Sequence, residues 1–146
     1  MASYLEIAAM PVVIDATVEW GQMDALGHVN NTTYFRYFEN VRIAYFERLM
    51  QGNLLDSQHL VPVLAETSCR FKMPLIYPDK LAIGAKVTEI LTDRIIMQYV
   101  VFSQKAQRIA AEGMGTVVCF DVSKHTKTAL PDHVTEAIRK LEGSQV

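Results

Sequence analysis

The sequence predicts an α+β fold in which an antiparallel β-sheet wraps around one long, mostly buried helix. Residues 31–50 carry apolar and aromatic side chains at three- and four-residue spacings, as expected for a helix with a wide apolar face. Four later segments, 63–72, 80–91, 95–103 and 108–122, alternate in polarity or are rich in β-branched residues, which is typical of strands. The helix and the strands do not alternate along the chain, which argues against a doubly wound parallel sheet.

The shorter elements follow from local patterns. Residues 12–20 alternate apolar and polar side chains and predict a first strand. Its apolar face would consist of Val12, Ile14, Ala16, Val18 and Trp20. Asn30 or Asn31 is expected to cap the long helix, and Gly52 lies where a left-handed residue would end it. A final short helix should open at Pro131-Asp132, with Asp132 as its N-cap, and run to Leu141.

Length and composition predict one domain over residues 1–146. Half of the residues are hydrophobic and 21% are charged, so we expect apolar surface to be buried between subunits. The net charge of −2 lacks the basic excess of a nucleic-acid-binding protein. No apolar run is long enough to cross a membrane. The N-terminal stretch carries Glu6 and no basic leader, so the expected location is the cytoplasm.

The residues that most often hold metals or cofactors show no such pattern here. Cys69 and Cys119 both lie in strand-like runs, where buried thiols are more common than a disulfide or a metal site. The histidines outside residues 20–34 have no ligand spacing, so no metal is expected. Gly113 and Gly115 lie within a strand and indicate a β-bulge or a close backbone approach rather than a phosphate loop. No nucleotide-binding glycine motif occurs, which favours chemistry without a cofactor.

Polar groups concentrate where the first strand leads into the long helix, in the segment WGQMDALGHVNNTTY of residues 20–34. Asp24 precedes the helix N-terminus, whose unpaired N–H groups and partial positive charge can stabilise an oxyanion. A carboxylate beside such donors suits acyl transfer, either as a nucleophile or as a base for water. His28 could orient the loop, contact the acyl group or carry a proton. Purely structural roles also fit: a turn for Asp24, a cap for Asn30 or Asn31, and packing for Tyr34.

This segment, continued through Phe35, Arg36, Tyr37, Phe38 and Glu39, resembles the signature of the hotdog-fold acyl-CoA thioesterases of the 4-hydroxybenzoyl-CoA thioesterase-like family. The resemblance extends more loosely over residues 12–140. It includes Val61-Pro62-Val63, Arg70-Phe71, the turn Tyr77-Pro78-Asp79-Lys80-Leu81, and Leu130-Pro131. Only residues 20–40 match a highly specific motif.

The resemblance implies a hotdog fold, a homodimer with sheets joined edge to edge, and hydrolysis of an acyl-CoA to a free acid and coenzyme A. A dimer of dimers is equally compatible. Asp24 matches the catalytic carboxylate, and the backbone N–H of Asn31 matches the donor to the thioester carbonyl. His28 completes the candidate catalytic set. The candidate substrate-binding residues are Asn30, Tyr34, Arg70, Lys72 and Arg94.

The chain departs from the family in two places. Gln22 stands where an acid is common, which indicates either a structural role for that acid or weaker hydrolysis here. The basic cluster that grips the coenzyme A phosphates in some members is reduced to Arg94, with Arg70 and Lys72 as alternatives. Glu39 is a further candidate base, since another hotdog branch uses a helix glutamate.

Two other functions remain open at the level of the sequence. A hotdog hydratase or dehydratase would pair Asp24 with His28, although the spacing differs. A hotdog protein can also bind an acyl-CoA without cleaving it. The acyl group itself and the choice between nucleophile and base for Asp24 do not follow from the sequence.

Overall fold

The computed structural model describes residues 2–50, 59–143 and 146, so Gly52 lies outside the described residues. The helices are α1 (Ala2–Ala8), α2 (Asn31–Met50) and α3 (Asp132–Glu142), and a single 3₁₀ turn covers Trp20–Gln22. The strands are β1 (Val12–Thr17), β2 (Leu60–Phe71), β3 (Lys80–Ile90), β4 (Arg94–Ser103), β5 (Arg108–Asp121) and β6 (Thr126–Lys127). The α+β prediction is confirmed, and the long helix has the predicted bounds.

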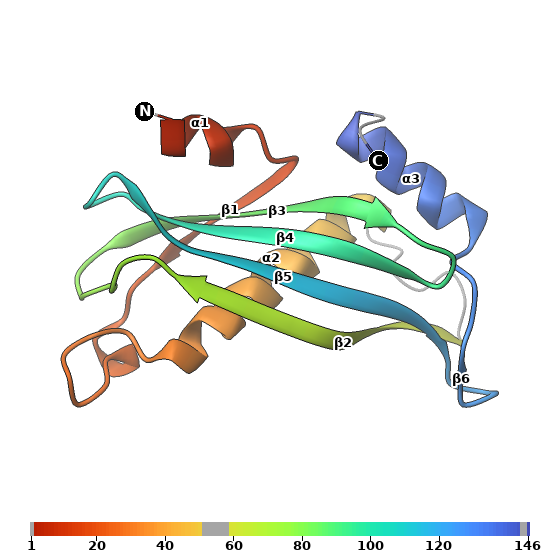
Figure 1. Cartoon of the computed structure of the whole chain (residues 1–146), viewed down its shortest axis with the longest axis horizontal. Helices are drawn as coiled ribbons and strands as arrows, with labels where there is room; N and C mark the ends of the chain where they lie inside the picture. The colour runs from red at the N-terminus through yellow and green to blue at the C-terminus, as the bar shows by residue number, and fades with distance from the viewer. Residues whose placement is uncertain (1, 51–58, 144–145) are drawn as a thin grey trace.

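The sheet is antiparallel throughout and has the order β1-β3-β4-β5-β2, with β6 paired to β5. It curls around α2, which lies along its concave face, while α1 packs on the opposite face (Figure 1). The strands β1 and β2 form the two edges. The N-terminus of α2, the end of β2 and the β4–β5 turn lie at the same end of the molecule (Figure 1). This end carries the candidate site.

The core lies between α2 and the concave face of the sheet. The buried side chains of α2 recur every three or four residues and are Tyr34, Tyr37, Phe38, Val41 and Tyr45. They meet alternate residues of β3, namely Leu81, Ile83, Ala85 and Val87, all at most 2% exposed. The two periodicities of 3.6 and 2 thus put both apolar sets on facing surfaces.

The glycines of β5 give α2 room to approach the sheet. A Cβ on Gly113 would lie 2.3 Å from the Phe38 ring, and a Cβ on Gly115 would lie 2.5 Å from the Tyr99 hydroxyl. The Phe38 ring of α2 stacks on the Tyr99 ring of β4, with ring centroids 5.0 Å apart. The predicted close backbone approach is confirmed.

Two local predictions were wrong, and one short helix was missed. The first strand ends at Thr17, and Trp20 is 74% exposed rather than on the apolar face, because the 3₁₀ turn changes the direction of its side chain. The helix α1 was not predicted; its Ile7 joins Met10 in a second apolar cluster on the convex face of the sheet. The N-cap of α3 is Pro131, so Asp132 is already the first helical residue and makes no side-chain cap.

Glu142 at the end of α3 fastens this helix to the core. Its Oε2 accepts hydrogen bonds from the Tyr45 hydroxyl at 2.7 Å and from the Val87 N–H at 2.8 Å. The Val87 N–H is available because the register of β3 against β4 shifts between Val87 and Glu89. Burial, followed by the bond to Glu142, raises the pKa of Tyr45, so the phenol stays a protonated donor.

We expect Glu142→Ala to lower the free energy of unfolding by about 1–3 kcal/mol, because two buried donors would lose their acceptor. Urea denaturation followed by circular dichroism measures this loss. Glu136→Ala, at an exposed position of the same helix, is the matched control and should unfold like the parent. Equal midpoints for the two variants would show that Glu142 does not hold α3 in place.

Candidate active site

The loop that leads into α2 is closed by short backbone contacts. The Asp24 N–H donates to the His28 carbonyl at 2.7 Å, and the Gly27 N–H donates to the Asp24 carbonyl at 3.0 Å. Met23 and Val29, which flank this loop in the sequence, form an isolated antiparallel β-bridge. Gly27 has a φ of 82°, a left-handed conformation that glycine adopts without a Cβ clash. The loop therefore holds Asp24 and His28 next to each other.

Asp24 is half-buried, and its two oxygens differ in their surroundings. Oδ1 accepts the Leu26 N–H at 2.8 Å and, more weakly, the His28 N–H at 3.4 Å. Oδ2 accepts no hydrogen bond from the residues that the structure describes. Oδ1 of Asp24 thus stabilises the turn, while Oδ2 can accept a hydrogen bond from a ligand or a water.

The Asn31 N–H in the first turn of α2 has no acceptor among the described residues. The Asn30 Oδ1 accepts the Thr32 N–H and the Thr32 hydroxyl, both at 2.9 Å, which confirms the predicted cap. The Thr33 N–H donates to the Asn30 carbonyl at 2.9 Å. The N–H of exposed Asn31 has no acceptor among residues 2–50 and 59–143. It is therefore a free donor at the positive end of a 20-residue helix.

A surface groove connects several of the predicted residues. It is lined by His28, Val29, Asn31, Tyr34, Phe71, Lys72, Met73 and Pro74. Tyr34 contacts Phe71 edge to face, with ring centroids 5.0 Å apart. Burial raises the pKa of the Tyr34 phenol, and a hydrogen bond from the Leu75 backbone partly offsets the rise. Tyr34 thus packs in the core and also lines the groove.

Gln22 ties the loop to the helix, a contact that the sequence did not reveal. Its Oε1 accepts the Glu19 N–H at 2.9 Å and the Tyr37 hydroxyl at 3.1 Å. Burial is the main cause that raises the pKa of Tyr37 to about 12, so the phenol remains a donor at neutral pH. A carboxylate oxygen could accept both bonds as well. Gln22 therefore links the loop to Tyr37 of α2, and an acidic residue at this position could make the same link.

The three basic candidates occupy different places. Lys72 lies in the groove and pairs with Glu112 at 2.6 Å. Arg70 is exposed on β2, opposite Glu112 in register, and lines a separate groove across the sheet. Arg94 starts β4 at the other end of the sheet, where its Nε lies 2.7 Å from Asp93. The structure brings only Lys72 of the three to the start of α2 in the same chain.

The charged side chains of α2 have different partners. Arg36 pairs with Glu39 at 2.6 Å, an exposed pair of little energetic weight. Arg42 donates to the Tyr99 hydroxyl at 3.2 Å, and no ion pair between Arg42 and Glu39 occurs in the described part of the chain.

Burial raises the pKa of the Cys69 thiol to about 11, so it is uncharged at neutral pH.

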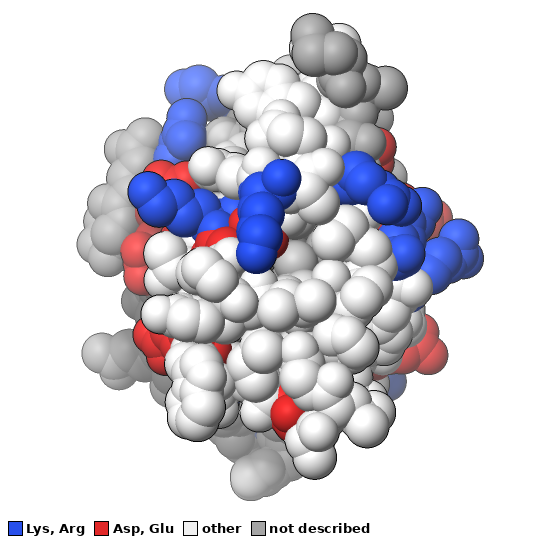
Figure 2. Space-filling model, turned by 90° about the vertical axis from the view of Figure 1, so that its left-hand side faces the viewer, with Lys and Arg blue, Asp and Glu red and all other residues white. Residues whose placement is uncertain are grey.

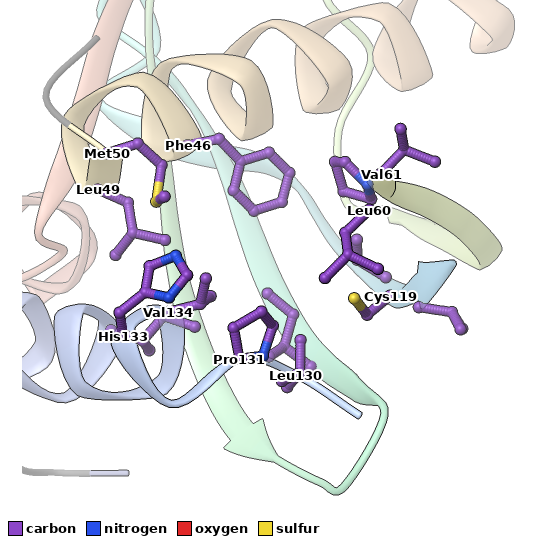
Figure 3. Close-up of a pocket in the computed structure, with 15 residues that line it drawn as sticks. Phe46, Leu49, Met50, Leu60, Val61, Cys119, Leu130, Pro131, His133 and Val134 are labelled. Carbon is purple, nitrogen blue, oxygen red and sulfur yellow. The ribbon is translucent and has the colours of Figure 1, made fainter. Parts of the chain in front are cut away.

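An apolar pocket of about 100 Å³ lies at the other end of α2 (Figure 3). Phe46, Leu49 and Met50 of α2 face Leu130, Pro131 and Val134 across it. None of the predicted site residues lines this pocket. Apart from Cys119 and His133, the side chains that line the pocket are aliphatic, aromatic or thioether groups, so it mainly offers space for apolar groups.

The described residues provide neither a metal-binding cluster nor a membrane-spanning helix. Residues 2–50, 59–143 and 146 contain no cluster of three or more His, Cys, Asp or Glu side chains suited to a metal ion. In the same part of the chain no helix is both long and apolar enough to cross a membrane.

Comparison with known proteins identifies the family. The model of the thioesterase-like superfamily matches residues 18–138. A Thermus thermophilus thioesterase crystallised with coenzyme A and zinc is 29% identical, with a TM-score of 0.78 over 92% of this chain and 97% of that one. A putative thioesterase from Pseudomonas aeruginosa is 27% identical, with a TM-score of 0.77 over 88% and 98%. The long-chain acyl-CoA thioesterase FadM of Escherichia coli is 20% identical over 82% of this chain and 90% of its own.

These matches cover the loop, the long helix and the sheet together, so they concern the whole arrangement and not one motif. The curled antiparallel sheet around α2 is the hotdog fold that the resemblance implies. The chain therefore belongs to the thioesterase-like superfamily, and the prediction of a thioester hydrolase is confirmed at the level of the family.

Proposed function

We propose that this protein hydrolyses an acyl-CoA thioester to a free carboxylic acid and coenzyme A. The observation that carries the proposal is the free N–H of Asn31 at the start of α2, reached by a loop that holds Asp24. A donor of this kind can bind the carbonyl oxygen and stabilise the negative charge that develops on it. The coenzyme A bound to the Thermus relative and the name of FadM support a coenzyme A thioester as the substrate.

The reaction needs one carboxylate and one oxyanion donor. The thioester oxygen would accept the Asn31 N–H, assisted by the positive end of α2. Asp24 would then attack the carbonyl carbon, or take a proton from a water that attacks it. The C–S bond breaks, and the sulfur leaves as the thiol after gaining a proton. If Asp24 is the nucleophile, water then hydrolyses the anhydride between Asp24 and the acyl group, so either route consumes one water. His28 and Tyr34, which line the groove, would contact the acyl group.

We also propose that the active form is a homodimer joined along β2. This strand has 12 residues and pairs with β5 on one side only among the described strands. A long strand with an open edge readily pairs with another chain. Its exposed Val63, Leu64 and Phe71 are 41%, 39% and 48% accessible and would gain cover from a second copy.

The experiment is thiol release from a panel of short, long and aromatic acyl-CoAs. At least one member should be cleaved at a rate proportional to the enzyme concentration. Tight binding without thiol release would instead support the non-hydrolytic alternative. A 2-enoyl-CoA added to the panel that loses its enoyl absorbance without thiol release would support the hydratase alternative.

A further inference from the structure

A second groove opens beside the loop that carries Asp24. Three segments line it: residues 17–20 at the end of β1, residues 77–80 before β3, and the pair Gln104 and Lys105 in the β4–β5 turn. Its volume is about 790 Å³, which is within the range of small-molecule sites. The Tyr77 N–H donates to the Met23 Sδ at 3.4 Å, so the groove wall is attached to the residue before Asp24.

Two lysines of this groove form no ion pair with the described residues. Lys80 and Lys105 are exposed, and neither forms an ion pair within the described residues. The neighbouring acid, Asp79, is only 9% exposed, and its oxygens accept the Ser103 hydroxyl and the Lys105 N–H. Asp79 therefore shapes the turn and holds Lys105 at the groove.

Other charged groups lie close to these two lysines. Glu19 is exposed and lines the groove, and Asp15 lines an adjoining hollow that shares Lys80. Arg108, at the start of β5, follows Lys105 at the same end of the sheet. Figure 2 looks onto this end and shows Lys and Arg side chains, with Asp and Glu side chains between them, above a largely uncharged surface.

Two exposed aromatic rings complete the groove. Trp20 is 74% exposed and Tyr77 is 45% exposed, although rings of this size are usually covered. Flat aromatic surfaces stack on nucleobases, and lysine ammonium groups bind phosphates as point charges. An aromatic pair beside two unpaired lysines is the combination that suits a phosphorylated purine nucleotide.

We infer that this groove binds the 3′-phosphoadenosine diphosphate part of coenzyme A, with Lys80 and Lys105 on its phosphates and Trp20 and Tyr77 against the adenine. The inference rests on the proposed function for its substrate and deepens it. It places the phosphate contacts on residues beside the Asp24 loop in the same chain and not on Arg94. The pantetheine arm would pass from this groove to the free N–H of Asn31.

Trp20 is the single tryptophan of the sequence, so its fluorescence reports on the groove directly. Adenosine 3′,5′-bisphosphate, which has no thioester, should quench this fluorescence in a saturable way. Replacing both lysines, Lys80→Ala with Lys105→Ala, should weaken the binding about tenfold, because exposed ion pairs each contribute only a few-fold in affinity. Lys124→Ala, an exposed lysine in the turn after β5, is the matched control and should bind like the parent.

Kinetics separate this inference from the proposed function. The double lysine variant should raise the KM for an acyl-CoA about tenfold and leave kcat/KM for the matching acyl-pantetheine unchanged, since that substrate lacks the nucleotide. Cleavage of acyl-CoA with no quenching of Trp20 and no KM change would overturn the groove assignment and leave the hydrolase intact. An effect of the lysines on an acyl carrier protein substrate alone would also overturn it.

Discussion

Replacing Asp24 with Asn should reduce kcat for acyl-CoA hydrolysis by about 10²–10⁴-fold, the range that a positioned acid–base group contributes. The substitution removes the negative charge and the basic oxygen but keeps an amide oxygen in the place of Oδ1. This oxygen can still accept the N–H groups of Leu26 and His28, so the loop should keep its shape. A loss of rate would then report on chemistry and not on folding.

Single-turnover thiol release measures the rate, and circular dichroism with thermal melting checks the fold. Glu136→Gln, which replaces an exposed acid on α3, is the control for the loss of a surface charge and should keep full activity. If Asp24→Asn hydrolyses its best substrate at the parental rate, the role assigned to Asp24 is wrong. Incorporation of oxygen-18 from water into Asp24 would further indicate a covalent intermediate rather than general-base catalysis.

Gly113→Ala should destabilise the protein by about 3 kcal/mol or prevent folding, at the upper end of the range for overpacking. The new Cβ would lie 2.3 Å from the Phe38 ring and 2.9 Å from the Ser68 carbonyl oxygen. The ring cannot retreat easily, because it stacks on Tyr99 and is 1% exposed. The clash would therefore push α2 and its free Asn31 N–H away from the sheet.

Urea denaturation of the parent and of Gly113→Ala gives the difference in stability. Gly21→Ala is the matched control, because a Cβ at Gly21 has no atom within 4 Å. It should unfold within about 0.5 kcal/mol of the parent, as most surface substitutions do. A Gly113→Ala variant as stable as Gly21→Ala would show that α2 can shift away from β5 at little cost.

The elements with long, regular patterns were predicted well. The apolar spacing over residues 31–50 matched α2 at both ends, and Asn30 capped it as expected. The first strand was extended too far, because the alternation of residues 12–20 continues into a 3₁₀ turn that has a different periodicity. The short helix α1 escaped notice, since seven residues are too few for a clear apolar stripe.

In the candidate site, too, local patterns predicted some features and missed others. The sequence singled out the segment with Asp24, His28 and Asn31, and the structure brings His28 and Asn31 to one groove with Asp24 on the adjoining loop. The roles of these residues in catalysis stay predictions. The bond from Tyr37 to Gln22 joins residues 15 apart and had no signal in the sequence. The groove at Trp20, Tyr77 and Lys105 is assembled from three separate segments, so no local pattern could reveal it.

The sequence by itself determined the class of fold, the long helix, and the short segment in which a carboxylate precedes a helix N-terminus. These depend on periodicity and on neighbours within a few residues, which the order of amino acids states directly. Only the tertiary structure decided which donors remain free, which charges are already paired and which rings stay exposed. Lys72 is held by Glu112 and Arg94 by Asp93, whereas Lys80 and Lys105 form no ion pair among the described residues. Such pairing and exposure are properties of three-dimensional packing, because the outcome for each group depends on residues brought close by distant parts of the chain.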